Sequence, residues 1–207
     1  MKKTSLGELI ANAVSHGVGV FVAIAMFVLL LVRSSGTEEV LSSLAFGVAM
    51  IVLYLSSTLF HSFPENMKIV SSVFKRLDHS SIFLLITGTY TPFIVLVARS
   101  TPGYILLGAL WLITIVGVVF KSIWIDRFHV IHLTLYVLMG WSVMLIWGDI
   151  RNDLGTALWF LLGGGISYTL GVAFYVSRFK YAHFVWHLFV LGGSISHFFA
   201  LWIILGK

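Results

Sequence analysis

The most prominent pattern in the sequence is a series of long runs that contain no Asp, Glu, Lys or Arg. Seven such runs are 20 to 26 residues long and together cover 161 of the 207 residues. A helix needs roughly 20 mostly apolar residues to cross a bilayer, and in lipid such runs satisfy their backbone hydrogen bonds as helices. We therefore predict an all-α, polytopic membrane protein, in which residues 1–207 form a single domain of seven transmembrane helices. Their approximate limits are 12–32, 40–61, 79–98, 102–120, 129–148, 155–176 and 183–205.

Composition agrees with this pattern and excludes several functional classes. Hydrophobic residues make up 59% of the chain and charged residues only 10%, whereas a soluble domain carries about 25% charged residues. A water-soluble enzyme or a disordered tail is therefore excluded. The net charge of +5 does not indicate nucleic-acid binding, because the basic residues are scattered. Cysteine is absent, so a metal site would have to be built from the eight His and the eight Asp and Glu.

The first predicted helix could be mistaken for a cleaved signal peptide, because Lys2 and Lys3 precede an apolar run. However, Glu8, Asn12 and His16 interrupt the run where a signal peptide would be apolar, and six further runs follow. We therefore expect the first helix to be retained.

The distribution of Lys and Arg predicts how the helices are oriented. Nine basic residues lie on the N-terminal side of the predicted membrane, and four lie on the opposite side: Arg33, Arg99, Arg151 and Lys207. Because basic residues collect in cytoplasmic loops, we expect the N-terminus in the cytoplasm and the C-terminus outside.

Three histidines and one aspartate are predicted to meet at the cytoplasmic level of the membrane. His183 and His187 lie one turn apart on one face of the seventh helix. The second helix ends near His61, and the third begins at Asp78. Three neutral imidazoles and a water molecule form a catalytic type of zinc shell. Zinc lowers the pKa of its bound water, and Asp78 could accept the proton of that water.

Each of these residues also has a purely structural interpretation. A single His near a helix end often only hydrogen-bonds to a backbone carbonyl or reaches the interface. Asp78 could serve as a helix N-cap, a role that is compatible with one at the metal. Ser57, one turn before His61, could anchor a metal ligand or an oxyanion or bond back to its own helix.

Other polar residues within the predicted helices are weaker candidates. Glu8, Asn12 and His16 form a stripe on the first helix, where they could face a cavity or support helix packing. His129 and His132 are a rival metal pair that no carboxylate motif accompanies. His197 lies ten residues beyond His187, or about 15 Å deeper, which favours an interhelical hydrogen bond.

The set of motifs resembles the progestin and adipoQ receptor (PAQR) family, and most closely its bacterial branch of hemolysin III-like membrane proteins. The segments that carry the resemblance are SSTLFHSFP, RLDHSSIFLLITGTYTPF, LYVLMGW and HFVWHLFVLGGSISHFFA. The resemblance implies a multi-pass protein of the bacterial cytoplasmic membrane, with zinc on His61, His183 and His187 and with Asp78 touching the metal through water. Related adiponectin receptors and alkaline ceramidases are zinc hydrolases of lipid amides. Asn12 and His16 also match the family, whereas Glu8 precedes Asn12 by one residue more than in the receptors.

Two main functions follow from these observations. The first is a zinc-dependent hydrolase that acts on a lipid amide or ester near the cytoplasmic face. The second is a non-enzymatic sensor or receptor of membrane lipid, with structural zinc; a pore-forming hemolysin fits less well. In both main cases a membrane lipid is the partner, as substrate or ligand. An open coordination position separates them, because a structural zinc site uses four protein ligands.

Overall fold

The described residues of the computed structural model, 5–63, 66–125 and 127–206 with the side chain of His129 left out, form helices joined by short connections. Seven segments among them are long and apolar enough to cross a membrane, as predicted. The elements are α1 (Leu6–Arg33), α2 (Thr37–Ser62), α3 (Lys68–Phe93) with the π-helical turn η1 (Ile94–Ala98), α4 (Thr101–Ile123), α5 (His129–Trp141), the 3₁₀ turn η2 (Ser142–Ile146), α6 (Trp147–Leu154), α7 (Ala157–Tyr175) and α8 (Ala182–Ile204).

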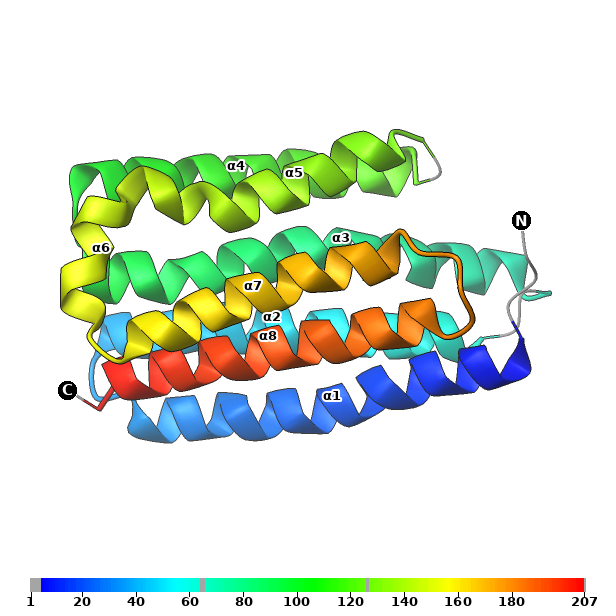
Figure 1. Ribbon diagram of the computed structural model, residues 1–207, viewed down its shortest axis with the longest axis horizontal. Helices are drawn as coiled ribbons and strands as arrows, with labels where there is room; N and C mark the ends of the chain where they lie inside the picture. Colours follow the sequence, from blue (N-terminus) through cyan, green and yellow to red (C-terminus); the bar gives the residue numbers. More distant parts are fainter. Residues whose placement is uncertain (1–4, 64–65, 126, 207) are drawn as a thin grey trace.

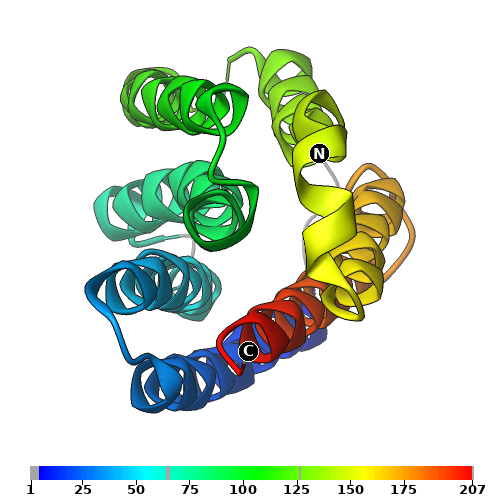
Figure 2. The ribbon, with the colours of Figure 1, turned by 90° about the vertical axis from the view of Figure 1, so that its left-hand side faces the viewer.

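The long helices run side by side as one bundle, with the start of α1 and the end of α8 at opposite ends of it (Figure 1). Seen end on, α1 to α4 follow one another along one side, and α5 to α7 return along the other (Figure 2). Helix α8 packs against both α7 and α1 and so joins the two sides. The start of α8, the end of α2 and the start of α3 therefore come to the end of the bundle where α1 begins.

A capping box starts α1. The Ser5 side chain accepts a hydrogen bond from the Glu8 backbone, and the Glu8 carboxylate accepts one from the Ser5 backbone N–H at 2.9 Å. Such a box satisfies backbone N–H groups that the first helical turn leaves free. The other Glu8 oxygen accepts the backbone N–H of Tyr181, at the start of α8, at 3.1 Å. Glu8 therefore holds the beginnings of α1 and α8 together.

Helix α3 is longer than the sequence pattern predicts. It begins at Lys68 with Met67 as its N-cap residue, so the interpretation of Asp78 as a helix N-cap is wrong. Lys75 and Arg76 interrupt the apolar run without ending the helix, because charged side chains are costly in lipid but not in a helix as such. Arg76, for example, donates from Nε to the carbonyl of Ser122 at the end of α4, at 2.8 Å.

The fifth transmembrane segment is broken rather than continuous over 129–148. Tyr90 of α3 inserts its hydroxyl into the backbone ladder, where it donates to the Gly140 carbonyl at 2.9 Å and accepts from the Val143 N–H at 2.7 Å. A side chain that enters the ladder in this way breaks a helix. The backbone tightens into η2 at this point and resumes as α6, which carries the segment to Leu154.

Large apolar side chains cover the outside of the bundle. Phe21, Val32, Leu145 and Trp159 are each more than 70% exposed. Apolar surface on this scale is unfavourable in water but matches the hydrocarbon of a bilayer. The interior, in contrast, holds buried histidines, serines and threonines. The chain is thus a multi-pass membrane protein whose polar residues face inward.

Candidate metal centre

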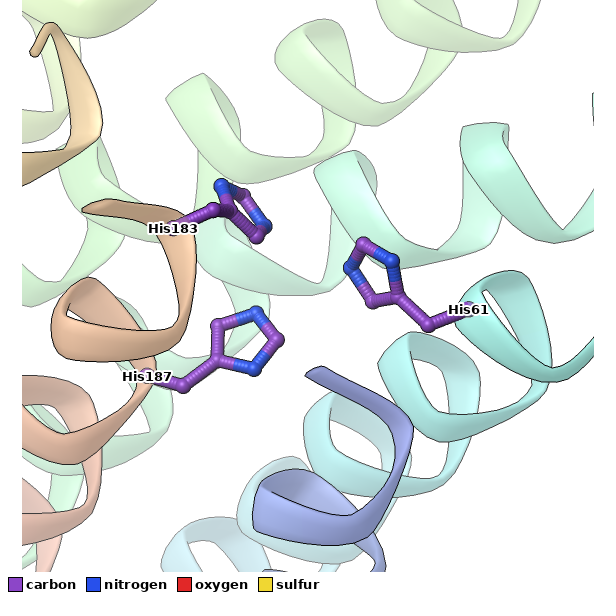
Figure 3. Close-up of side chains that lie close together, drawn as sticks. All are labelled: His61, His183 and His187. Carbon is purple, nitrogen blue, oxygen red and sulfur yellow. The ribbon is translucent and has the colours of Figure 1, made fainter. Parts of the chain in front are cut away.

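Three histidine rings converge inside the bundle, at the end where α1 begins (Figure 3). His61 comes from the last turn of α2, and His183 and His187 come from the first two turns of α8. Each offers one ring nitrogen, and these nitrogens lie within 4.8 Å of one another. An ion at their centre would need each nitrogen to move by less than about 1 Å to reach a Zn–N distance of about 2.0–2.1 Å. The three histidines could therefore hold a metal ion.

The hydrogen bonding of the rings fits a metal site. His61 Nε2 is buried and has no hydrogen-bond partner among the described residues. Buried polar atoms are rarely left unpaired, so we expect this nitrogen to bind a ligand such as a metal ion. His187, only 1% exposed, places Nδ1 at 2.9 Å from Ser15 Oγ. Its Nε2 remains for an ion, and imidazole nitrogen is a common ligand of zinc and other transition metals.

Asp78 lies beside these histidines but outside the group of three. It sits in the interior of α3, and it lines a small cavity together with Ser57, His183 and His187. Its Oδ2 atom is 3.6 Å from His79 Nδ1. That His79 nitrogen also lies 2.8 Å from the carbonyl of Lys75. The cavity thus brings a carboxylate close to the imidazoles without making it part of their cluster.

Ser57 occupies the position on α2 one turn before His61 and is 1% exposed. Its hydroxyl has no hydrogen bond of ordinary geometry within the described residues, so bonding back to its own helix is not observed. It lies near the Asp78 carboxyl group, across the same cavity. Such a hydroxyl can bind a polar group that enters the cavity.

The stripe on the first helix divides into residues at the site and residues away from it. The His16 ring stacks on the His187 ring, with centroids 3.5 Å apart and planes 10° apart, and it lines the cavity. Asn12 is buried but is not among the lining residues. Glu8 is absent from the lining as well, because its carboxylate is bound to Ser5 and Tyr181.

His132 and His197 lie away from the cluster. His132 Nδ1 is 2.8 Å from the carbonyl of Phe128, and the side chain of its proposed partner His129 lies outside the described residues. His197 Nε2 is 3.0 Å from the carbonyl of Leu161 on α7, which confirms the expected interhelical hydrogen bond. Neither His132 nor His197 belongs to the histidine cluster.

Sequence reasoning missed two residues that the fold brings to the site. Ser15 contacts His187 across 172 positions of sequence, and serine is too common in transmembrane helices to signal such a contact. Tyr175, at the end of α7, lines the cavity with its ring centroid 5.9 Å from that of His183. An aromatic residue at the end of a span is normally an interface anchor, so its position gave no indication of this role.

A larger apolar cavity adjoins the histidines. It is lined by residues of α2, α3, η1, α5, η2, α6, α7 and α8. Leu53, Ile82, Trp186 and Val190 line both this cavity and the smaller one beside the histidines. Ile146 and Ile150 line the large cavity further along the bundle. The histidine cluster thus borders an apolar cavity.

Comparison with known proteins identifies relatives along almost the whole chain. A model of the family described as haemolysin-III related matches residues 7–198. The chain is 39% identical to Hemolysin-3 of Bacillus cereus over 199 residues, which cover 94% of this chain and 90% of that protein. It is 37% identical to the Hemolysin-3 homolog of Bacillus subtilis (strain 168) over 202 residues, with coverage of 95% and 94%.

A human protein is also similar. Monocyte to macrophage differentiation factor is 28% identical over 205 residues, which cover 97% of this chain and 85% of the human protein. Both the family match and the bacterial relatives extend across the seven helices and over the residues that converge at the histidine cluster. The chain therefore belongs to the haemolysin-III-related family of membrane proteins, within the progestin and adipoQ receptor family.

Proposed function

We propose that this protein is a zinc-dependent hydrolase that cleaves a lipid amide or ester within the membrane. The observation that carries the proposal is the convergence of His61, His183 and His187, whose ligand nitrogens lie within 4.8 Å of one another. Zinc bound by three neutral imidazoles retains an open position, where it acidifies a water molecule or polarises a carbonyl oxygen.

In this proposal, Asp78 transfers the proton of the attacking water molecule. Its carboxylate lines the cavity with His183 and His187 but is not part of the three-histidine group. This placement supports contact with the metal through water rather than direct ligation. Asp78 would accept a proton from the attacking water and return it to the leaving group. Ser57, on the same cavity, would donate its hydroxyl hydrogen to the substrate carbonyl.

The adjoining apolar cavity supports a lipid as the substrate. Pockets for small ligands are lined mostly by apolar residues, and this cavity is lined largely by aliphatic and aromatic residues. An acyl chain in this space would bring the amide or ester at its head towards the histidines, because Leu53, Ile82, Trp186 and Val190 line both cavities.

The proposed site lies near the cytoplasmic face of the bacterial cytoplasmic membrane. This placement rests on the charge distribution, which puts nine of the thirteen basic residues on the side of the N-terminus. The histidine cluster lies at the end of the bundle where α1 begins. Product with a polar head would thus leave towards the cytoplasm.

The proposal is tested by lipid hydrolysis with purified protein in detergent micelles. We expect mass spectrometry to detect fatty acid released from ceramide-like amides or from lipid esters when zinc is bound. A chelator should stop this release, and added zinc should restore it. Full zinc occupancy without turnover on any of these lipids would contradict the hydrolase and favour a lipid sensor with structural zinc.

A further inference from the structure

Helix α1 contributes no ligand to the histidine cluster, yet it holds one of the three rings in two ways. Ser15 Oγ lies 2.9 Å from His187 Nδ1. The neighbouring residue, His16, stacks its ring on that of His187 with centroids 3.5 Å apart and planes 10° apart. The hydrogen bond fixes the direction of the ring edge and the stacking fixes the ring plane, so both rotations of the His187 side chain are constrained.

The direction of the hydrogen bond follows from the partners of Ser15. A serine hydroxyl carries one hydrogen, and Ser15 donates it to the carbonyl of Asn12, one turn earlier in α1, at 2.9 Å. Ser15 Oγ is therefore an acceptor towards His187, and His187 Nδ1–H is the donor. The neutral imidazole then carries its lone pair on Nε2, the nitrogen that remains for the cluster.

We propose that Ser15 is a positioning residue for the metal centre, which holds His187 in the Nδ1–H tautomer and aims Nε2 at the ion. The inference rests on the proposed zinc site. Histidine ligands of metals usually donate their second ring N–H to a neighbouring acceptor, and loss of that acceptor typically lowers metal affinity by about 10–100-fold. The alternative is that Ser15 only stabilises the packing of α1 against α8.

The experiment measures the affinity of metal-free protein for Zn²⁺ in detergent micelles, by competition with a chromophoric chelator. Ser15→Ala should weaken affinity by about 10–100-fold, whereas Ser15→Thr keeps the hydroxyl and should restore it. The matched control is Ser194→Ala, on the same helix as His187. Ser194 is fully buried and bonds to the hydroxyls of Tyr54 and Tyr168, at 2.7 and 2.8 Å.

A purely structural role predicts a different pattern. If Ser15 only supports packing, Ser15→Ala should lower the melting temperature of the metal-free protein, as Ser194→Ala should, and leave zinc affinity at the wild-type value. If Ser15 positions His187, zinc affinity should fall in Ser15→Ala but not in Ser194→Ala. If Ser15→Ala does not fold, Ser15→Cys keeps the volume of the side chain and replaces the hydroxyl with a weaker acceptor, so it should lower affinity in the same direction. Wild-type affinity in a folded Ser15→Ala or Ser15→Cys protein would overturn the inference.

This result is separable from the fate of the proposed function. Zinc affinity that depends on Ser15 in a protein without lipid hydrolysis would refute the hydrolase and support the positioning role. Hydrolysis by a Ser15→Ala protein with unchanged zinc affinity would refute the positioning role and support the hydrolase. A wild-type protein without measurable zinc affinity would refute both.

Discussion

Replacement of Asp78 by Asn separates proton transfer from metal binding. The side chain keeps its shape, but an amide cannot accept the proton of a water molecule. Asp78 lies in the interior of α3 rather than at its start, so the change removes no helix cap. Asn and Asp also have similar helix propensities. We therefore expect the free energy of unfolding to change by less than about 1 kcal/mol.

The expected effects on zinc and on the rate differ strongly. Zinc should remain bound, because the three imidazoles form a group that does not include Asp78. The hydrolysis rate should fall by about 10²–10⁴, the usual contribution of a general base. That loss corresponds to about 2.7–5.4 kcal/mol of activation free energy, at 1.36 kcal/mol per factor of ten.

The assay measures zinc content, melting temperature and lipid hydrolysis on the same purified protein. Glu39→Gln offers a matched control, because Glu39 is a partly buried carboxylate in the first turn of α2, away from the site. Its rate should equal that of the wild type. Loss of zinc from Asp78→Asn would make Asp78 a fourth ligand and the site structural. Unchanged hydrolysis would refute its role in proton transfer.

Three further predictions concern topology and packing. A reporter fused after Lys207 should be active as alkaline phosphatase and dark as a green fluorescent protein, because the charge distribution places the C-terminus outside; the reverse pattern would overturn the orientation. A Cβ atom at Gly164 would collide with the His197 ring, whereas at Gly165 it would meet nothing within 4 Å. Thermal unfolding should therefore show Gly164→Ala destabilised by about 1–3 kcal/mol and Gly165→Ala close to wild type, and equal stability would contradict the packing of α7 on α8. Tyr90→Phe removes the hydroxyl that hydrogen-bonds to two backbone groups, the Gly140 carbonyl and the Val143 N–H, at the break of the fifth segment. It should cost about 1–3 kcal/mol, and an unchanged melting temperature would show that the break does not depend on this side chain.

The seven transmembrane segments could be predicted because lipid imposes a strong and local rule. Charged side chains are excluded from the hydrocarbon, so their spacing marks each segment. The same rule misplaced the start of α3, which begins at Lys68 rather than near His79. A helix can extend beyond the hydrocarbon, and the charges of Lys75 and Arg76 mark where the lipid ends rather than where the helix ends.

The break in the fifth segment was not predictable from local sequence. Its cause is Tyr90, about 50 residues away in the chain, and residues 142–146 contain no Pro or Gly that would signal a break. A prediction of this feature would require knowledge of how α3 packs against α5. Tertiary contacts of this kind override local helix propensity.

The histidine cluster was predictable because the predicted direction of each helix gives the depth of each histidine in the membrane. Lys and Arg set the direction of each helix, and the directions brought His61, His183 and His187 to one level, where the structure places their rings together. The residues that contact the ring of His187 were only partly predictable. His16 was a candidate because imidazole is rare within the membrane, whereas Ser15 carried no signal of its own.

Zinc content of the purified protein is the sharpest test of the proposed three-histidine metal site. Plasma mass spectrometry should find about one zinc per chain in the wild type, the occupancy of a single three-histidine site. His61→Ala, His183→Ala and His187→Ala should each lose it. His132→Ala should retain it, because His132 lies outside the cluster, with Nδ1 at 2.8 Å from the carbonyl of Phe128. A wild-type protein that stays free of metal after zinc loading, or a His183→Ala protein with full zinc content, would contradict the account.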